Sequence, residues 1–320
     1  MGKELKVVFM GTPEFAVTAL DEITKSKHKI VGVVTVPDKP SGRGLHVSES
    51  AVKKYALQLN VPILQPEKLK SKLFIQQLTD LKADVFVVVA FRILPKEIFT
   101  IPKMGTFNLH ASLLPQLRGA APINFAIING LKETGVTTFF LDEKVDTGEI
   151  LLQEKIEIEP SENAGSLHDK LMDLGKDVII KTLDGIAEKT INPKIQANDK
   201  EIVYAPKIEK EDCEIDWKKP VNEIHNFIRG MSPYPCAFTT ISIDDQKKIL
   251  KIFEGKVIHE KPNVSFHTIE TNKKECKIAL KNVWYSLEDV QLEGKKRMKI
   301  KDFLNGIQGK NLSIEIGNTI

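Results

Sequence analysis

Cysteine is scarce in this chain of 320 residues. Only Cys213, Cys236 and Cys276 are present, and they lie far apart without forming a CxxC pair. This spacing predicts neither a disulfide framework nor a cysteine-ligated zinc site, and we expect no metal. A chain of this length buries roughly three quarters of its unfolded surface, so it needs no such cross-links to fold.

Long apolar runs are absent as well. The longest, Val85 to Phe91, falls far short of the roughly 20 residues that span a bilayer. The N-terminus passes from Met1 through the charged stretch Lys3 to Lys6 into a strand-like run, without the apolar core of a signal peptide. We therefore expect a cytoplasmic protein with no membrane partner, and we expect it to be a monomer.

Neither sign of charge dominates, because 46 basic side chains face 43 acidic ones. Residues 1–203 have 26 of each sign, whereas residues 204–320 have 20 basic against 17 acidic side chains. Lysine clusters in this last third lie at Lys247–Lys248, Lys273–Lys274 and Lys295–Arg297. They are consistent with a solvated face or with a surface that binds phosphates, and composition does not decide between the two.

Strand-like and helix-like patterns alternate through the first 190 residues. The segment Val85 to Ala90 is apolar throughout, which is typical of a parallel strand covered by helices on both faces. Strands are also expected at 5–10, 30–36, 62–64 and 106–110, with antiparallel additions at 135–141 and 150–158. Helices are expected at 13–25, 48–59 with Ser48 as N-cap, 68–81 and 121–129. The order indicates the α/β class and a Rossmann-like, doubly wound domain.

The pattern changes after a connector that is rich in Asn and Pro. A short helix at 221–229 is followed by short strands separated by polar turns, at 237–243, 248–258, 278–280 and 312–316. Such strands predict a small OB-like β-barrel. We therefore expect a catalytic domain at 1–190, a linker at 191–206 and a C-terminal β-barrel domain at 207–320.

Two glycine-containing turns are candidate binding loops. Gly11 follows the first strand, but the GxGxxG fingerprint of dinucleotide-binding proteins is missing, so a nicotinamide oxidoreductase is disfavoured. The loop Pro37–Gly44 contains Arg43 between two glycines. It is either an ordinary surface turn or a loop that contacts phosphates or base edges.

The candidate catalytic side chains are Asn108, His110 and Asp146. Asn108 and His110 alternate along one strand, so both project to the same side near its carboxyl end. An amide that stabilises an oxyanion beside an imidazole that moves protons suits acyl transfer. Asp146 precedes a glycine in a second loop and is a candidate partner for the imidazole. Taken singly, each residue also fits a structural role.

The pattern as a whole resembles the methionyl-tRNA formyltransferases, within the wider superfamily that uses 10-formyltetrahydrofolate. The resemblance covers nearly the whole chain. Its segments are Val8–Phe15, Pro37–Gly44, Val88–Pro95, Asn108–Pro122, Asp146–Gly148, Ile215–Trp217, Arg229–Pro235 and Gly294–Met298. The NxH pair, SLLPxxRGxxP and DTG are together specific for the superfamily, whereas the Pro37–Gly44 loop and the KKRM element narrow it to the tRNA enzymes.

The resemblance implies the roles of the three candidates. Asn108, His110 and Asp146 match the family's catalytic triplet. The free α-amine of methionyl initiator tRNA would attack the formyl carbon on N10 of the folate. Asn108 and His110 would stabilise the oxyanion, while Asp146 would orient the imidazole and assist proton transfer. Neither a covalent enzyme intermediate nor a metal is required.

The resemblance also implies the binding residues. The 10-formyltetrahydrofolate co-substrate would contact Phe91, Arg92, Ile93, Leu94, Ser112, Leu113, Leu114, Pro115, Glu143 and Val145. The tRNA partner would contact Lys39, Arg43, Lys247, Lys248, Lys295, Lys296 and Arg297. The chain departs from the family pattern at four positions. Glycine is common where this chain has Arg92 and Cys236, an aromatic residue where it has Leu117, and methionine where it has Phe140.

Two alternatives stay open from the sequence. A folate-dependent formyltransferase that acts on an amino sugar or a purine precursor would share the three catalytic candidates, but it would not need the Arg43 loop or the basic barrel. The other is an RNA-binding module on a catalytically inactive α/β scaffold, which the retention of all three polar residues disfavours and which an activity assay would exclude.

Overall fold

The structure, a computed structural model, describes residues 3–41, 46–197 and 202–314. Contacts group the chain into two compact units. The first comprises Met1–Pro122, Glu133–Glu157 and His168–Tyr204, and the second comprises Ile123–Lys132, Ile158–Leu167 and Ala205–Ile320. In the ranges that the structure describes, no helix is both long enough and apolar enough to cross a membrane.

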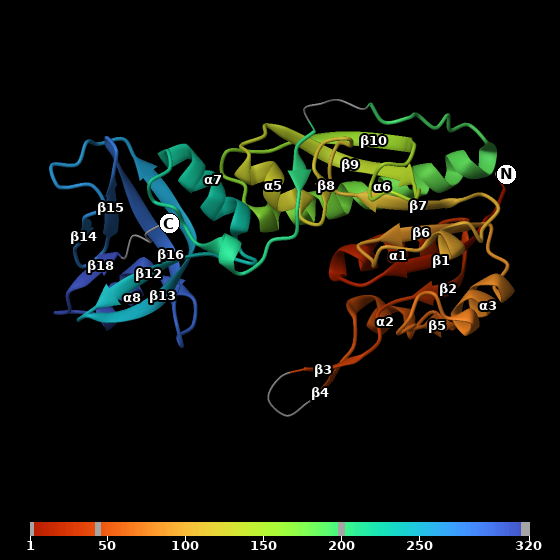
Figure 1. The fold of residues 1–320 in the computed structure, drawn as a ribbon, viewed down its shortest axis with the longest axis horizontal. Helices are drawn as coiled ribbons and strands as arrows, with labels where there is room; N and C mark the ends of the chain where they lie inside the picture. Colours follow the sequence, from red (N-terminus) through yellow and green to blue (C-terminus); the bar gives the residue numbers. More distant parts are fainter. Residues whose placement is uncertain (1–2, 42–45, 198–201, 315–320) are drawn as a thin grey trace. The chain divides into compact units, whose positions relative to one another are not determined.

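The first unit is built on a seven-stranded sheet (Figure 1) with the strand order β10-β9-β7-β6-β1-β2-β5. Its strands are β1 (Lys6–Gly11), β2 (Lys29–Val34), β5 (Ile63–Leu64), β6 (Val85–Val89), β7 (Thr106–His110), β9 (Glu133–Phe140) and β10 (Ile150–Glu157). Across the sheet from β5 to β7 the strands pair in parallel, whereas β9 is antiparallel to β7 and β10 to β9. The Rossmann-like fold and its antiparallel additions are confirmed.

The helices of the first part of the chain are α1 (Glu14–Lys25), α2 (Ala51–Ala56), α3 (Lys72–Asp80), α4 (Lys96–Phe99), α5 (Pro122–Ile128) and α6 (Ala164–Glu188), and its short strands are β3 (Lys39–Ser41), β4 (His46–Ser48) and β8 (Arg118–Gly119). Helix α2 begins later than expected. The Ser50 hydroxyl accepts a hydrogen bond from the Lys53 N–H at 3.0 Å, so Ser50 is the N-cap and the prediction of Ser48 is wrong.

The two faces of this sheet are covered by different helices. Phe74 and Leu78 of α3 pack with Val8 and Phe86 in one apolar cluster. On the other face, a Cβ at Gly175 of α6 would come within 2.8 Å of a Leu109 methyl group, so this helix lies directly against β7. The side chains of β7 therefore alternate between an apolar layer formed by α6 and the opposite face of the sheet.

Helix α6 is the largest element that the sequence analysis did not predict. Its 25 residues include fully buried Leu167, Leu171, Val178 and Leu183, which recur at helical spacing. The signal was therefore present. A buried hydrogen bond of 2.8 Å joins the Thr182 and Thr138 hydroxyl groups and ties the helix to β9.

The second unit is an antiparallel sheet with the order β14-β15-β16-β13-β12-β18, to which β17 adds beside β16. Residues of the two end strands, β14 and β18, lie close together, so the sheet is nearly closed and the predicted OB-like barrel is confirmed. Its elements are β12 (Ala237–Ile243), β13 (Gln246–Ile258), β14 (Ile269–Thr271), β15 (Cys276–Leu280), β16 (Val283–Leu292), β17 (Met298–Lys299), α8 (Ile300–Gly306) and β18 (Leu312–Ile314).

Two aromatic residues mark the core of the second unit. Trp217 and Tyr285 are almost fully buried and meet edge to face at 5.9 Å between ring centroids. The Trp217 indole donates a hydrogen bond to the Thr239 hydroxyl at 3.0 Å, which satisfies its only polar atom. The barrel is preceded by β11 (Tyr204–Ala205), a 3₁₀ turn at Glu211–Cys213 and α7 (Val221–Met231).

Candidate active site

The candidate site lies where β7 ends. Strand β7 pairs in parallel with β6, and Val88 is the partner of Asn108, so the carboxyl ends of both strands meet at one edge of the sheet. Phe139 of β9 lies opposite Asn108, and its ring contacts the ring of His110 edge-on. Asn108 and His110 therefore share the face of β7 that is turned away from α6, as expected from their spacing.

The imidazole of His110 is held from one side. Its Nε2 donates a hydrogen bond to the Leu117 carbonyl oxygen at 2.8 Å. Since a carbonyl only accepts, this contact places a proton on Nε2, and in the neutral imidazole Nδ1 is then the base. Nδ1 lies 4.0 Å from Oδ2 of Asp146, with the two side chains only 7% and 12% exposed. The structure thus brings the predicted imidazole and carboxylate together in a nearly enclosed setting.

The loop that contains Asp146 is held by contacts with the backbone of neighbouring segments. Asp146 has a φ of 56°, in the left-handed region that Asp tolerates better than most residues. Its Oδ2 accepts a hydrogen bond from the Gly119 N–H at 2.9 Å. Gly148 is required two residues later, because a Cβ there would lie 1.7 Å from the Phe140 carbonyl oxygen. The DTG sequence therefore reflects a close approach between backbone segments.

The loop after β7 is tied down by side chains that the sequence analysis did not single out. The Thr137 hydroxyl accepts a hydrogen bond from the Leu114 N–H at 3.1 Å and donates one to the Ser112 carbonyl at 2.6 Å. The Gln153 amide donates to the Leu114 carbonyl at 2.8 Å. Thr137 lies on β9 and Gln153 on β10, so the antiparallel additions to the sheet hold this loop in place.

A second pair that the sequence analysis missed lies beside Asp146. Arg118 is buried, and its guanidinium donates to the Gln196 side-chain oxygen from Nε at 3.2 Å and from a terminal nitrogen at 2.6 Å. The Gln196 amide nitrogen donates to the carbonyl oxygens of Asp146 and Gly148, at 2.9 and 2.8 Å. Arg118 stands in the SLLPxxRG pattern and was available as a signal, whereas Gln196 lies in the connector, outside any motif.

The predicted folate residues after β6 differ in exposure. Ile93 is 76% exposed and Leu94 is buried, while Phe91 and Arg92 are half-buried. The Arg92 guanidinium donates to the carbonyl oxygens of Pro66 and Glu67, at 2.7 and 3.2 Å. Burial lowers the pKa of Arg92, although the group stays charged.

The remaining predicted folate residues lie in two loops. Ser112 is fully buried and its hydroxyl donates to the Gln116 carbonyl at 2.6 Å, and Leu114 is also buried, so only Leu113 and Pro115 expose part of their side chains. In the other loop Val145 is half exposed, and Glu143 pairs with Lys96 of α4. That ion pair connects the loop of Asp146 with the segment that follows Phe91 to Leu94.

The three thiols belong to the second unit. Cys213, Cys236 and Cys276 are all buried and free. Burial raises the pKa of the Cys236 and Cys276 thiols to about 12, so both stay protonated at neutral pH and are not nucleophiles. Cys236 has a φ of 78°, which explains why glycine is common at that position in the family it resembles.

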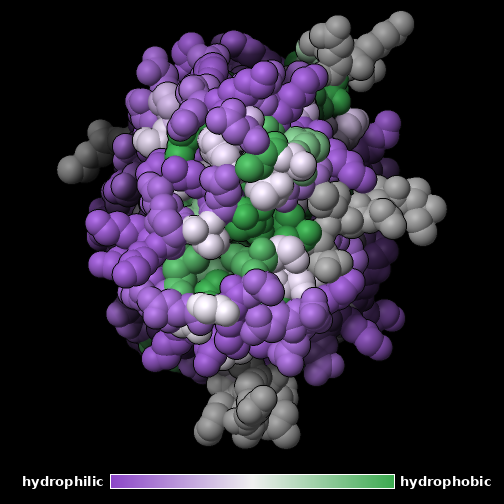
Figure 2. Space-filling view, turned by 90° about the vertical axis from the view of Figure 1, so that its left-hand side faces the viewer, coloured by the Kyte–Doolittle hydropathy of each residue, from purple (hydrophilic) through white to green (hydrophobic). Residues whose placement is uncertain are grey.

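The predicted RNA-binding residues fall into three groups. Lys39 is exposed, and Arg43 lies outside the described residues. Two lysines, Lys247 and Lys248, lie at the start of β13, and two others, Lys295 and Lys296, lie in the turn after β16. A hydrogen bond of 2.9 Å from the Glu293 N–H to the Ile249 carbonyl joins these two segments. Two clusters that are distant in sequence thus lie at the same end of the barrel. Figure 2 shows a largely hydrophilic face with an apolar area near its centre.

Arg297 differs from its lysine neighbours. Its guanidinium forms a two-point ion pair with the buried carboxylate of Asp289, at 3.0 and 3.1 Å, and lies 4.2 Å from the centre of the Phe253 ring. Burial acts to raise the pKa of Asp289, but hydrogen bonds from Arg297 and Lys299 outweigh it and hold that pKa below its usual range. Arg297 therefore has a structural partner within the barrel.

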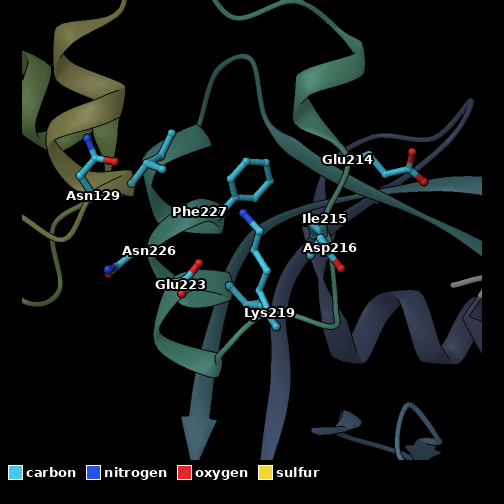
Figure 3. A pocket seen from close by; sticks show the side chains of 10 residues that line it. Asn129, Glu214, Ile215, Asp216, Lys219, Glu223, Asn226 and Phe227 are labelled. Atoms are coloured by element: carbon cyan, nitrogen blue, oxygen red, sulfur yellow. The ribbon is translucent and has the colours of Figure 1, made fainter. Parts of the chain in front are cut away.

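A cavity of 380 Å³ lies in the second unit (Figure 3). It is lined by α7, by the segment before α7 and by the end of α5, and it contains none of the predicted site residues. Its lining residues are Ile128, Asn129, Glu214, Ile215, Asp216, Lys219, Glu223, Ile224, Asn226 and Phe227. Across the part of the chain that is described, no group of three or more His, Cys, Asp or Glu residues is arranged to hold a metal ion.

Family profiles match both parts of the chain. The formyl transferase profile matches residues 5–183, and the profile for the formyl transferase C-terminal domain matches residues 207–308. A methionyl-tRNA formyltransferase of Flavobacterium johnsoniae is 50% identical over 305 residues, which cover 95% of this chain and 97% of that protein. The protein of the same name from Bacteroides thetaiotaomicron is 47% identical over 311 residues, covering 96% and 97%.

Solved structures with the same fold are more distant in sequence. An N-formyltransferase from Helicobacter canadensis, in complex with folinic acid and dTDP-3-aminofucose, is 22% identical with a TM-score of 0.63 and covers 92% of this chain and 100% of that one. HypX from Aquifex aeolicus in complex with tetrahydrofolic acid is 14% identical with a TM-score of 0.66, covering 96% of this chain and 48% of that one. These likenesses concern the fold alone. With both profiles matched and curated relatives near 50% identity over almost its full length, the chain belongs to the formyl transferase family, as predicted.

Proposed function

We propose that this protein transfers the formyl group of 10-formyltetrahydrofolate to the free α-amine of methionyl initiator tRNA. The observation that carries the proposal is the meeting of Asn108, His110 and Asp146 at one edge of the sheet. The name that the relatives near 50% identity share supports the choice of acceptor. We propose that the reaction takes place in the cytoplasm.

His110 and Asp146 account for the proton that the attacking amine must lose. The Nε2 proton is engaged by the Leu117 carbonyl, so Nδ1 is the ring atom that receives a proton from the amine. The imidazolium that forms is stabilised by the Asp146 carboxylate 4.0 Å away. The new bond joins the amine nitrogen to the formyl carbon, and the bond between that carbon and N10 of the folate breaks. N10 takes up one proton as it leaves, which balances the proton that the amine loses.

Asn108 is placed to stabilise the negative charge that develops on the formyl oxygen. Its Oδ1 is buried and has no hydrogen-bond partner among the described residues, although the residue as a whole is only half-buried. An amide oxygen only accepts, so the amide nitrogen is the atom of this side chain that can donate to a ligand. A positioned amide donor of this kind typically contributes about 10²- to 10³-fold to acyl transfer.

The loops around this edge suit a ligand that is partly flat and apolar and partly polar. Exposed Ile93 and half-exposed Val145 offer apolar walls, and the buried Nε of Arg92 has no partner among the described residues. Phe91 to Leu94, Leu113, Pro115 and the Glu143–Val145 loop would hold the folate. When bound, this co-substrate supplies the activated formyl group, and the protein residues position it and move the protons.

The tRNA would contact the lysines at the end of the barrel together with Lys39 and Arg43. Phosphate contacts of this kind position a nucleic acid without reading its sequence. In this proposal residues 1–190 form the catalytic domain, 191–206 the linker and 207–320 the RNA-binding domain. No metal is needed for any of these steps.

The proposal is tested by measuring formyl transfer from 10-formyltetrahydrofolate to purified methionyl initiator tRNA. Elongator methionyl-tRNA and uncharged tRNA are the controls. We expect rapid formylation that is selective for the initiator. Absence of transfer, with folate still bound, would overturn the choice of acceptor and make amino sugars the next acceptors to assay.

A further inference from the structure

We propose that Gln196 is a positioning residue for formyl transfer, which holds the loop of Asp146 against the loop that orients His110. The proposal rests on the function proposed above. Gln196 is only 7% exposed and lies in the connector after α6, outside every motif described above. Its role is visible only in the folded chain.

All four hydrogen-bonding positions of the Gln196 carboxamide are filled. Its oxygen accepts two hydrogen bonds from Arg118, and its nitrogen donates to the carbonyl oxygens of Asp146 and Gly148. Arg118 only donates and the carbonyls only accept, so these partners fix the orientation of the amide. A reversed amide would place donor against donor and acceptor against acceptor.

The two loops that Gln196 joins contain the contacts of the catalytic pair. Leu117, next to Arg118, accepts the hydrogen bond from His110, and Gly119, on the other side of Arg118, donates to the Asp146 carboxylate. The Gln196 amide nitrogen bonds the backbone carbonyl of Asp146, whereas Gly119 bonds its carboxylate. Gln196 therefore sets the separation between the imidazole and the carboxylate without contacting either side-chain group.

The backbone of the connector keeps Gln196 in place. Lys194 and Ile150 exchange two backbone hydrogen bonds of 2.8 and 2.9 Å, which anchor the connector to β10. Farther along, the Val203 carbonyl accepts a hydrogen bond from the Leu117 N–H at 2.7 Å, and the Val203 N–H donates to the Gln116 side chain at 3.0 Å. The connector is thus anchored both before and after Gln196, to β10 on one side and to the loop of Leu117 on the other.

The test compares Gln196→Met with Thr182→Val. The first keeps the size of the side chain and removes its four hydrogen bonds, whereas the second removes a buried hydroxyl that bonds Thr138 and Val178, away from both loops. We expect Gln196→Met to lower kcat about 30- to 100-fold with KM for both substrates within about 3-fold, because a shift of about 1 Å is enough to cost that much. Thr182→Val should lower Tm and leave kcat unchanged.

A second readout does not depend on activity. The Nε2 proton of His110, held by the Leu117 carbonyl, should give a downfield proton NMR signal in the full-length protein, assigned by its loss in His110→Gln. We expect this signal to broaden in Gln196→Met and to persist in Thr182→Val. An unchanged signal and an unchanged kcat in Gln196→Met would overturn the proposal, as would an equal loss of kcat in both variants.

The two readouts separate this proposal from the proposed function. If the wild-type protein formylates no tRNA but the His110 signal broadens in Gln196→Met, the function is wrong and the positioning role stands. If formylation is normal and both the signal and kcat are unaffected in Gln196→Met, the function stands and the positioning role is wrong.

Discussion

The two units of the chain use polar side chains in opposite ways. In the first, buried polar groups near one edge of the sheet form directional hydrogen bonds, His110 with the Leu117 carbonyl and Arg118 with Gln196. In the second, the main core cluster is apolar and most charged groups lie outside it, many in ion pairs such as Lys256–Glu288, while the buried carboxylate of Asp289 is an exception. The first arrangement holds a few buried side chains in defined positions, whereas the second places charged side chains on the protein surface.

This contrast teaches where each unit is vulnerable. A directional network loses its function when one atom is displaced, because buried polar partners are then left unsatisfied. A charged surface loses its function gradually, in proportion to the charges removed and to the salt present. Substitutions in the two units should therefore differ in size and in the property that they change.

The largest effect is expected from His110→Ala. It removes the proposed base, and we expect kcat for formyl transfer to fall at least about 100-fold, the usual scale for acid–base groups. The matched control is His168→Ala, which changes a partly exposed histidine of α6 in the same unit. Near-normal turnover of His110→Ala would break the comparison, because the first unit would then not depend on directional contacts.

Arg297→Ala tests whether the second unit also contains one directional contact. Loss of the guanidinium leaves the buried Asp289 carboxylate with Lys299 alone, so we expect the free energy of unfolding to fall by about 1 to 2 kcal/mol. Lys296→Ala, one residue earlier, should change it by less than about 0.5 kcal/mol. Urea denaturation measures both, and equal losses would mean that the ion pair with Asp289 adds no stability.

The lysines at the end of the barrel should act through salt-sensitive binding. Replacing Lys295 and Lys296 together by alanine should reduce the slope of log affinity for tRNA against log salt by about 2, because each lysine is expected to neutralise one phosphate. Lys256→Ala is the control, since that lysine pairs with Glu288 on the same barrel. A slope that is unchanged in the double variant would remove these lysines from the tRNA surface.

The smallest effect is expected from pH, and it should appear in both units. Burial lowers the pKa of His28 below its ordinary value of 6.5 despite the hydrogen bond to Asp184, and burial also lowers the pKa of His225. The unfolded chain then binds more protons below about pH 6.5, so stability should fall as the pH drops from about 7 to 5.5. Thermal melts should show less pH dependence for His28→Gln, and a stability that rises on acidification would contradict the assignment.

The sequence predicted the strands and the shared face of the candidate residues Asn108 and His110 because these signals are local. Val85 to Val89 is apolar at every position, and the two-residue spacing of Asn108 and His110 places them on one face whatever surrounds them. The roles of Gln153 and Gln196 were not predictable in this way. Gln196 meets Arg118 across 78 residues, and only the folded sheet brings the two together. The expected roles of the folate and tRNA residues stay predictions.

The contacts of the connector change where the catalytic part of this chain can be cut. A fragment that ends at residue 190 would retain Asn108, His110 and Asp146, yet it would lose the strand-like pairing of Lys194 with Ile150 and the carboxamide that faces Arg118. Arg118 would then be a buried cation without its acceptor. We therefore expect that a fragment which keeps the candidate site intact must extend at least to Val203, because its carbonyl and N–H bond Leu117 and Gln116.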